Sequence, residues 1–296
     1  MRSKKFFKSY DYESAAGSLL GGIKMIPYDF TGLIGQIERY NPFPSTLVPP
    51  RIVDVWLPPG YTDSSERYSV LYMSDGQNLF NPELSKLSHF AWVMDETVNR
   101  LIEEGRIRKI IVVGIWFTKV RVREYLPQKA VSGIKKIVLD LHLHGSPNSD
   151  RYLRFMVEEL KPFVDSNYHT KKNANDTFIM GSSMGGLISL YALCEYPEVF
   201  GGAGCVSTHF PIGKGAMLDY MKAKLPDPAH HRIYFDFGTG SLDAAYEPYQ
   251  QMADEIMQAK GYIQGIDWLT KRFEGHDHSE KYWRERVHFP LEFLLG

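Results

Sequence analysis

The fold is constrained most by short, wholly apolar runs that alternate with longer stretches whose apolar residues have helical spacing. The sequence IIVVGIW at residues 110–116 is one such run. A strand without polar alternation is buried on both faces, as happens when helices cover both sides of a parallel sheet. Apolar residues at helical spacing in residues 92–104 and 152–164 predict such helices. The alternation therefore predicts an α/β fold with a mostly parallel central sheet and helices on both faces.

The predicted elements follow one another in a regular order. Strands are expected at residues 51–57, 68–73, 109–117, 177–180, 202–206, 232–237 and 267–273. Helices are expected at residues 92–104, 152–164, 184–195, 246–260 and 280–295. Residues 1–45 lack strong periodicity and are expected to form an N-terminal arm packed on the domain. Residues 46–296 contain no convincing linker, which predicts one catalytic domain.

Composition excludes several classes of protein. The 296 residues are 44% hydrophobic, which is enough for one large core, and the formal net charge is -1. Without a long basic run, the chain lacks the electrostatic footprint of a nucleic-acid-binding protein. The chain also lacks a run of about 18–20 apolar residues, which a membrane helix needs. We expect a soluble, cytoplasmic protein without nucleic-acid or membrane partners, because KSYDYE follows the basic start where a secretory signal would continue with apolar residues.

A glycine-rich turn follows the strand predicted at residues 177–180. The sequence GSSMGG at residues 181–186 holds a Gly-x-Ser-x-Gly motif centred on Ser183, directly before a predicted helix. In a nucleophile elbow, glycines two residues before and after the serine remove side chains that would collide in the tight turn. The motif predicts that Ser183 is a nucleophile at a helix N-terminus, where the dipole favours negative charge. Ser182 is the neighbouring alternative, but the glycine spacing centres on Ser183.

A serine hydroxyl needs a histidine to accept its proton, and a carboxylate to hold that histidine in the correct tautomer. In the strand–turn–helix setting of this motif, the acid and then the histidine follow the serine along the chain. We predict His276 as the base, because it lies in a loop between the last strand and the last helix. His278, two residues later, is the near rival. His209 follows the strand at residues 202–206 and is expected to line the same cleft.

For the carboxylate, Asp243 is the predicted residue. It follows the strand at residues 232–237 and the turn Gly-Thr-Gly-Ser, so it lies beyond the carboxyl end of a strand, where α/β folds gather their sites. Asp236 lies inside that strand and is expected to be a structural carboxylate. Glu247 is a weaker alternative.

Acyl transfer also requires donors that stabilise the negative charge on the carbonyl oxygen, and losing one donor costs about 3–4 kcal/mol. The Met184 amide, directly after the nucleophile, is one predicted donor. The second is expected in the loop SDGQNLF at residues 74–80, after an early strand. There Gly76 is expected to let the backbone approach the substrate, with the Gln77 N–H as the donor.

Several segments in order resemble the putative-esterase family of α/β-hydrolases, which includes feruloyl and acetyl-xylan esterases, enterochelin esterases, S-formylglutathione hydrolases and mycolyltransferases. They are VWLPPGY at 55–61, LYMSDGQNLF at 71–80, REYLP at 123–127, EELKPF at 158–163, GSSMGGL at 181–187 and GHD at 275–277. The resemblance implies an α/β-hydrolase fold and a triad of Ser183, His276 and an acid after Gly238-Thr239. It also implies an oxyanion hole shaped by Gln77 and Met184. In this family the acid often comes sooner and is often glutamate, whereas three residues separate Thr239 from Asp243.

The predicted function is that of a serine carboxylesterase that acts through an acyl-enzyme on a small acyl or aryl ester, including one carried by a carbohydrate. No cofactor is expected. Trp116, His209 and Trp283 fall near predicted strand ends or helix starts, and we expect them to contact the substrate.

Three alternatives remain open. An acyltransferase would use the same triad and pass the acyl group to an alcohol. A non-catalytic binding module would share the fold without the chemistry. A metal-dependent hydrolase would use two His-x-His pairs, His142 with His144 and His276 with His278, whose spacing suits two ligands on one strand face.

Overall fold

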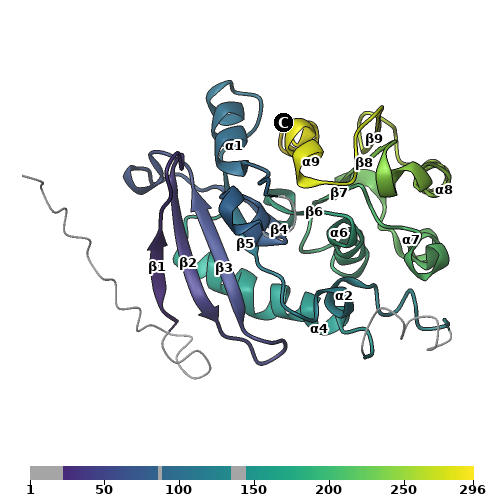
Figure 1. Cartoon of the computed structure of the whole chain (residues 1–296), viewed down its shortest axis with the longest axis horizontal. Helices are drawn as coiled ribbons and strands as arrows, with labels where there is room; N and C mark the ends of the chain where they lie inside the picture. Colours follow the sequence, from purple (N-terminus) through teal and green to yellow (C-terminus); the bar gives the residue numbers. More distant parts are fainter. Residues whose placement is uncertain (1–22, 86–88, 135–144) are drawn as a thin grey trace, which may run out of the picture.

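The computed structural model describes residues 23–85, 89–134 and 145–296. These residues form one nine-stranded sheet in the order β1-β2-β3-β5-β4-β6-β7-β8-β9 (Figure 1). The strands are β1 Met25–Tyr28, β2 Gln36–Phe43, β3 Arg51–Leu57, β4 Ser69–Ser74, β5 Ile110–Ile115, β6 Thr177–Ser182, β7 Gly202–Val206, β8 Arg232–Gly238 and β9 Trp268–Phe273. The neighbours from β5 through β9 are parallel, whereas β1, β2 and β3 join the sheet by antiparallel pairing. The mostly parallel sheet predicted from the apolar runs is confirmed.

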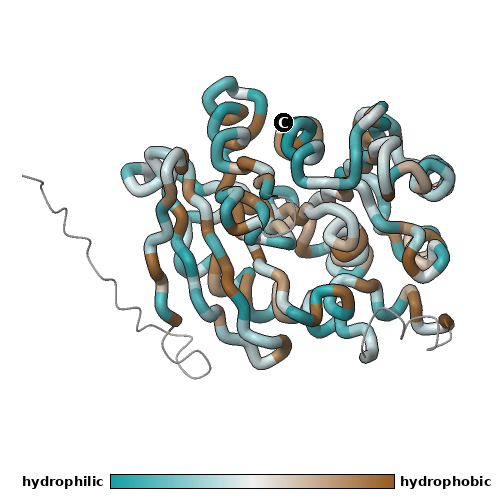
Figure 2. The backbone as a smooth tube through the Cα atoms, viewed as in Figure 1, coloured by the Kyte–Doolittle hydropathy of each residue, from teal (hydrophilic) through white to brown (hydrophobic). Residues whose placement is uncertain are grey.

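Helices cover both faces of this sheet (Figure 1). They are α1 Met94–Glu103, α2 Arg121–Tyr125, α4 Ser149–Arg154, α5 Lys161–Asn167, α6 Met184–Glu195, α7 Ala216–Lys224, α8 Glu247–Ala259, α9 Glu280–Arg286 and α10 His288–Leu295. In α1, hydrophobic and hydrophilic stretches alternate, as expected of a helix with one buried side (Figure 2). No helix among the described residues is long and apolar enough to cross a membrane.

Strand β5 shows why its sequence carries no polar alternation. Ile111, Val113 and Ile115 belong to the core cluster beneath α4, α5 and α6. Ile110 and Val112 belong to a second cluster beneath α1 and α10. Successive side chains of a strand point to opposite faces, so β5 is buried on both sides and needs apolar residues at each position.

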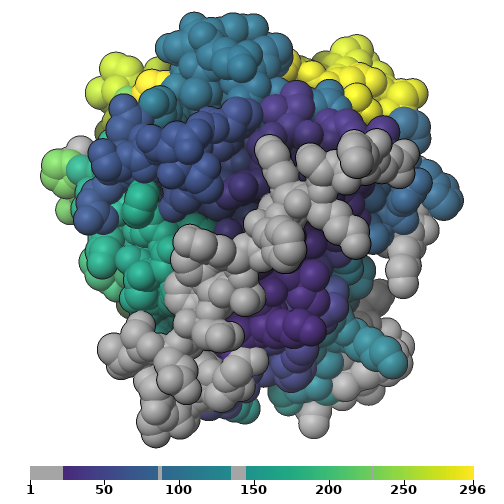
Figure 3. Space-filling view, turned by 90° about the vertical axis from the view of Figure 1, so that its left-hand side faces the viewer, coloured from purple at the N-terminus to yellow at the C-terminus, as the bar shows by residue number. Residues whose placement is uncertain are grey.

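The N-terminal arm expected over residues 1–45 differs in the structure. Strands β1 and β2 lie within it, and β2 pairs directly with β3, so residues on both sides of position 45 share one sheet. Figure 3 shows these purple strands at the surface of the molecule. Local periodicity did not reveal β2, because its register shifts between Tyr40 and Phe43 and interrupts the two-residue repeat.

Two predicted helices also differ in detail. The helix expected at residues 152–164 extends over α4, a π-helical segment Phe155–Leu160 and α5. The helix expected at residues 280–295 is divided into α9 and α10 at Val287. Neither difference moves the loop at residues 274–279 away from the carboxyl end of β9.

Candidate active site

Ser183 occupies a sharp turn between β6 and α6. Its backbone has φ 58° and ψ −119°, a conformation that residues other than glycine rarely adopt. The turn is held on both sides, because the Ser183 amide donates to the Val206 carbonyl at 2.9 Å and the Ser183 carbonyl accepts from the Gly186 amide at 3.1 Å. The strained backbone is therefore fixed by the adjoining strand and helix, which leaves Ser183 half-buried at the carboxyl edge of the sheet.

The two glycines of the motif are needed because of one neighbour, Ser74. A Cβ atom at Gly181 or at Gly185 would collide with the Ser74 Oγ atom. Ser74 is the last residue of β4, so this contact packs the loop after β4 against the start of α6. The elbow and the predicted oxyanion loop therefore touch directly.

The loop after β4 carries Gln77, the expected second oxyanion donor. Its side-chain Oε1 accepts from the Phe117 amide at 3.3 Å, which ties the loop to the end of β5. The preceding Asp75 is in the left-handed region at φ 58°, and its carboxylate receives two hydrogen bonds from Arg121, each 2.7 Å long. Within the described part of the chain, the backbone N–H groups of Gln77 and Met184 make no hydrogen bond. Both backbone amides are thus available to an acceptor outside the described residues.

Gly76 was expected to allow the backbone to approach a substrate, but the structure gives it a different partner. A Cβ atom there would lie 2.6 Å from the carbonyl carbon of Gly114 in β5. The glycine is required because two backbone segments pack closely, which brings the start of the oxyanion loop onto the sheet.

Asp243 lies in the turn after β8 and is fully buried. Its Oδ1 atom is 2.5 Å from Nδ1 of His278. Its Oδ2 atom accepts from the Ser207 hydroxyl at 2.6 Å and from the Gly238 amide at 2.7 Å. Burial raises the pKa of Asp243, but the hydrogen bond and charge of His278, with the Ser207 and Gly238 bonds, outweigh it and hold that pKa below its ordinary value. The carboxylate is therefore ionised at neutral pH and oriented by three partners.

The predicted pairing of Asp243 with His276 is not what the structure shows, because His278 occupies that position. The His276 ring instead packs between Phe273 and Tyr282, with centroid distances of 5.4 and 4.8 Å. Its Nδ1 atom is buried and has no hydrogen-bond partner in the described part of the chain.

The backbone of the loop explains this exchange of histidines. The His276 carbonyl accepts from the Gly240 amide at 2.9 Å, and the His278 amide donates to the Ser241 hydroxyl at 3.0 Å. The loop is thus bound to the turn after β8 at both positions. In this register the side chain of residue 278, not that of residue 276, reaches the acid.

A buried polar network lies behind Asp243. The Ser207 hydroxyl accepts from the Trp283 indole at 3.0 Å and from Arg286 Nη2 at 2.7 Å while it donates to Asp243. Arg286 Nη2 also donates to Asp236 Oδ1 at 3.0 Å, and both residues are fully buried. Burial raises the pKa of Asp236, although the charge of Arg286 acts in the opposite direction. Asp236 is thus part of the internal support, in keeping with the structural role predicted for it.

The three residues expected to contact a substrate have different surroundings. The Trp116 indole donates to Asp54 at 2.8 Å, and the guanidinium of Arg39 lies 4.8 Å from the centre of its ring. Trp283 is only 5% exposed, and its indole donates to the Ser207 hydroxyl. The His209 amide donates to the Ser183 carbonyl at 3.2 Å, which places that histidine beside Ser183.

Sequence reasoning did not identify Ser207, Arg286 or Tyr246 as members of this site. Ser207 follows the end of β7, just as Ser183 follows β6, and this position after a parallel strand was a usable signal. Arg286 lies inside a helix and resembles any other helical arginine. The hydroxyl of Tyr246 is 2.5 Å from His209 Nδ1, a contact that no local pattern indicates.

The described residues contain no group of three or more His, Cys, Asp or Glu side chains arranged to hold a metal ion. His142 and His144, one of the two pairs considered for such a site, lie outside the described residues. In the other pair, His278 contacts Asp243 whereas His276 packs on aromatic rings, so the two side chains do not share a partner.

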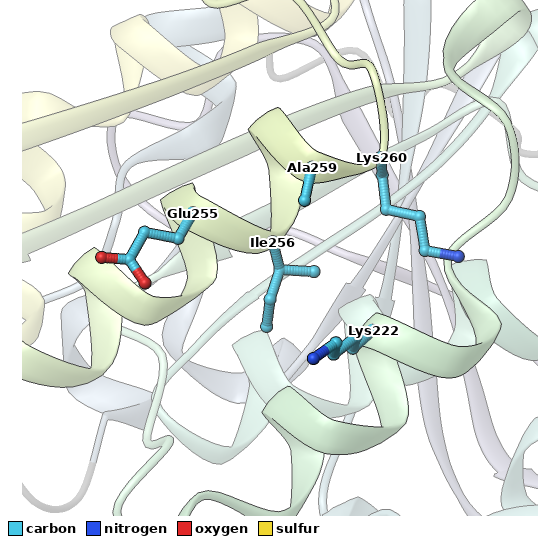
Figure 4. Close-up of a pocket in the computed structure, with 5 residues that line it drawn as sticks. All are labelled: Lys222, Glu255, Ile256, Ala259 and Lys260. Atoms are coloured by element: carbon cyan, nitrogen blue, oxygen red, sulfur yellow. The ribbon is translucent and has the colours of Figure 1, made fainter.

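A surface hollow of about 410 Å³ lies between α7 and α8 (Figure 4). It is lined by Lys222, Glu255, Ile256, Ala259 and Lys260. None of these residues belongs to the elbow, the acid–histidine pair or the oxyanion loop, so this hollow is separate from the candidate active site.

Comparison with solved structures defines the class of protein. A ferulic acid esterase from Anaeromyces mucronatus has a TM-score of 0.61 and 18% identity, and the match covers 95% of this chain and 92% of that one. The enterobactin esterase FES from Shigella flexneri also has a TM-score of 0.61 and 18% identity, with 89% of this chain and 59% of that one covered. At such identities the likeness shows the fold alone, and this fold is that of an α/β-hydrolase.

Sequence comparison gives the family. Residues 46–288 match the model of the family described as putative esterase, so the chain belongs to that family. The uncharacterized protein YbbA of Bacillus subtilis strain 168 is 23% identical over 249 residues, which cover 82% of this chain and 91% of YbbA. The predicted resemblance is confirmed, and membership of this family identifies the protein as an esterase-type hydrolase.

Proposed function

We propose that this protein is a serine carboxylesterase in which Ser183 is the nucleophile, His278 the general base and Asp243 the orienting acid. The observation that carries the proposal is the 2.5 Å contact between His278 Nδ1 and the buried Asp243 carboxylate. An imidazole held through Nδ1 has Nε2 available to accept a proton from the serine hydroxyl. Relative to the prediction from sequence, the serine and the acid are kept and the base moves by two residues.

Tyr246 supports the placement of Ser183 and His278 in one site. Its ring lies 5.7 Å from the His278 ring in an edge-on arrangement. The Ser183 side chain also acts on the Tyr246 hydroxyl, whose pKa it lowers against the larger effect of burial. The proposed nucleophile and the proposed base therefore both act on the same tyrosine.

The reaction proceeds through a covalent acyl-enzyme. Ser183 Oγ attacks the ester carbonyl while His278 accepts the hydroxyl proton, which His278 then donates to the departing alcohol. The amides of Gln77 and Met184 stabilise the oxyanion, since neither is committed to another group in the described residues. Water, activated by His278, then releases the acid and regenerates Ser183.

The proposed substrate is a small acyl or aryl ester, including one carried by a carbohydrate. Phe117 is 38% exposed, and its amide is bonded to the Gln77 side chain, so an apolar ring lies beside the oxyanion loop. His209 lies next to Ser183 and is the second proposed contact. The names of the structural neighbours refer to ferulic acid and to enterobactin, which agrees with an ester that carries an aromatic group.

Hydrolysis of a short-chain aryl ester tests this proposal. Ser183→Ala should abolish hydrolysis without loss of folding, and a serine-directed phosphonate should label the wild-type protein at Ser183. Ser182→Ala is the matched control, because Ser182 is the adjacent serine and is the buried last residue of β6. Hydrolysis that persists in Ser183→Ala would exclude the proposed mechanism. Addition of an acceptor alcohol, with analysis of the products, separates hydrolysis from acyl transfer.

A further inference from the structure

Tyr246 lies immediately beside the acid of the candidate site. Its amide donates to the Asp243 carbonyl at 2.9 Å, so a single helical turn links the two residues. The Tyr246 side chain is only 2% exposed, and Ser183 is one of the groups that affect the pKa of its hydroxyl. A polar group held at this depth beside a nucleophile must be satisfied by specific partners.

One such partner is His209. The Tyr246 hydroxyl lies 2.5 Å from Nδ1 of His209, with the ring centroids 5.7 Å apart. Burial raises the pKa of Tyr246 far above its ordinary value, and the charge of Asp243 adds to this rise, whereas the hydrogen bond with Ser183 acts against it. Tyr246 therefore remains a neutral phenol at working pH, with one proton to donate.

His209 is itself fixed relative to the nucleophile. It follows β7, and its amide donates to the Ser183 carbonyl at 3.2 Å. The imidazole thus comes from a different strand end than His278, which follows β9. The two histidines therefore have different partners, Asp243 for His278 and Tyr246 for His209.

We propose that Tyr246 is an additional catalytic residue, which donates a hydrogen bond to Ser183 Oγ and is oriented for this by His209. In this arrangement Nδ1–H of His209 donates to the phenol oxygen, and the phenol proton points to Ser183 Oγ. The proton of Ser183 is then left for His278, and the phenol stabilises negative charge as it develops on Oγ. This inference rests on the proposed function, in which Ser183 is the nucleophile.

The direction of these bonds has a chemical consequence. A phenol carries one proton, so Tyr246 can donate to His209 or to Ser183, but not fully to both. If it donated to His209, Ser183 would be free to donate to the phenol, and its proton would point away from His278. The proposed role of His209 is to prevent this arrangement.

Tyr246→Phe removes only the hydroxyl and tests the proposal. We expect kcat for an aryl ester to fall about tenfold, the worth of one good hydrogen bond, with KM within about twofold. The rate at which a serine-directed phosphonate labels Ser183 should fall by a similar factor. Tyr262→Phe is the matched control, because Tyr262 is also buried and its hydroxyl donates to the Pro226 carbonyl at 2.9 Å. This control should leave both rates unchanged.

The part played by His209 is tested by combining substitutions. If His209→Gln acts through Tyr246, it should slow labelling in the wild-type background and have little further effect in Tyr246→Phe. Fully additive losses would overturn the proposed orientation by His209. Tyr246→Phe that labels Ser183 at the wild-type rate would overturn the role of Tyr246 and leave the proposed esterase function intact. A wild-type protein that the phosphonate does not label at Ser183 would overturn both.

Discussion

His278 Nδ1 lies 2.5 Å from Asp243 Oδ1, and this contact links the loop after β9 to the turn after β8. Three residues separate Thr239 from Asp243, and two of them, Gly240 and Ser241, bind the backbone of the histidine loop at His276 and His278. The length of this turn and the identity of the histidine are therefore coupled.

The two histidines of the loop are predicted to differ strongly in their effect on activity. His278→Ala should lower kcat by about 10³-fold or more, since the base of a Ser-His-acid site is removed. His276→Ala should change kcat only a few-fold, because that ring packs on Phe273 and Tyr282. Steady-state hydrolysis of an aryl ester measures both variants. The opposite ranking would restore His276 as the base.

Asp243→Asn is predicted to lower kcat by about 10⁴-fold with little change in shape, because an amide does not hold the histidine in the required tautomer. Measurement of kcat beside a circular dichroism spectrum checks this expectation. An active Asp243→Asn enzyme would exclude Asp243 as the acid.

The stability of wild-type protein relative to Asp243→Asn should also depend on pH. The pKa of Asp243 is lower in the folded protein, so its ionised form contributes stability above the unfolded pKa of about 3.9. That contribution is lost as the pH falls from this value through the folded pKa. Urea titrations over this range should show the difference in unfolding free energy shrinking at acid pH. A difference that grows on acidification would contradict the assigned direction.

Arg286→Met is predicted to destabilise the protein by about 3–5 kcal/mol, because it leaves the buried carboxylate of Asp236 without its cation. The loss should be smaller at low pH, where Asp236 takes up a proton, and smaller again in Arg286→Met combined with Asp236→Asn. Arg154→Met is the control. Its pair with Glu158 is about half exposed, so it should cost less than about 1 kcal/mol. Equal losses of stability in Arg286→Met and Arg154→Met would show that burial does not increase the contribution of the Arg286–Asp236 pair to stability.

Gly185→Ala is predicted to disrupt the elbow, and Ser74→Ala is predicted to rescue it. The added Cβ collides with Ser74 Oγ, but it lies 3.5 Å from Ser74 Cβ, an ordinary contact once the hydroxyl is removed. Activity of the double variant should therefore exceed that of Gly185→Ala. Gly181→Ala should not be rescued by Ser74→Ala, because its Cβ also meets the Gly185 backbone at 2.9 Å. Thermal unfolding and ester hydrolysis of the four variants decide this, and an equal rescue at both glycines would disprove the explanation.

Much of this architecture could be predicted from local pattern. The apolar run in β5 indicated a strand buried on both faces, and its residues do divide between the two core clusters. The glycine spacing around Ser183 predicted a tight strand-to-helix turn, which the structure contains. These features are local, because the backbone geometry of a strand and of a tight turn restricts which residues can occupy neighbouring positions.

Other features depended on contacts between distant segments. His276 and His278 share one short loop, and no local signal distinguishes them. The choice comes from hydrogen bonds to a turn more than thirty residues earlier. Strand β2 was also not predicted, since its pairing register with β3 shifts between Tyr40 and Phe43 and interrupts the local two-residue repeat. Ser207, Arg286 and Tyr246 likewise join the site through contacts across the sheet edge.

The amino-acid sequence by itself determined most of the alternating strands and helices from residue 51 onward, the tight turn at Ser183 and the position of Asp243 beyond β8. The tertiary structure decided which histidine reaches that acid and which buried groups support it. The physical reason is that the two kinds of interaction act over different distances along the sequence. Hydrophobic periodicity and turn sterics act between residues a few positions apart, whereas a hydrogen-bonded site is assembled from strand ends that meet only when the sheet has formed.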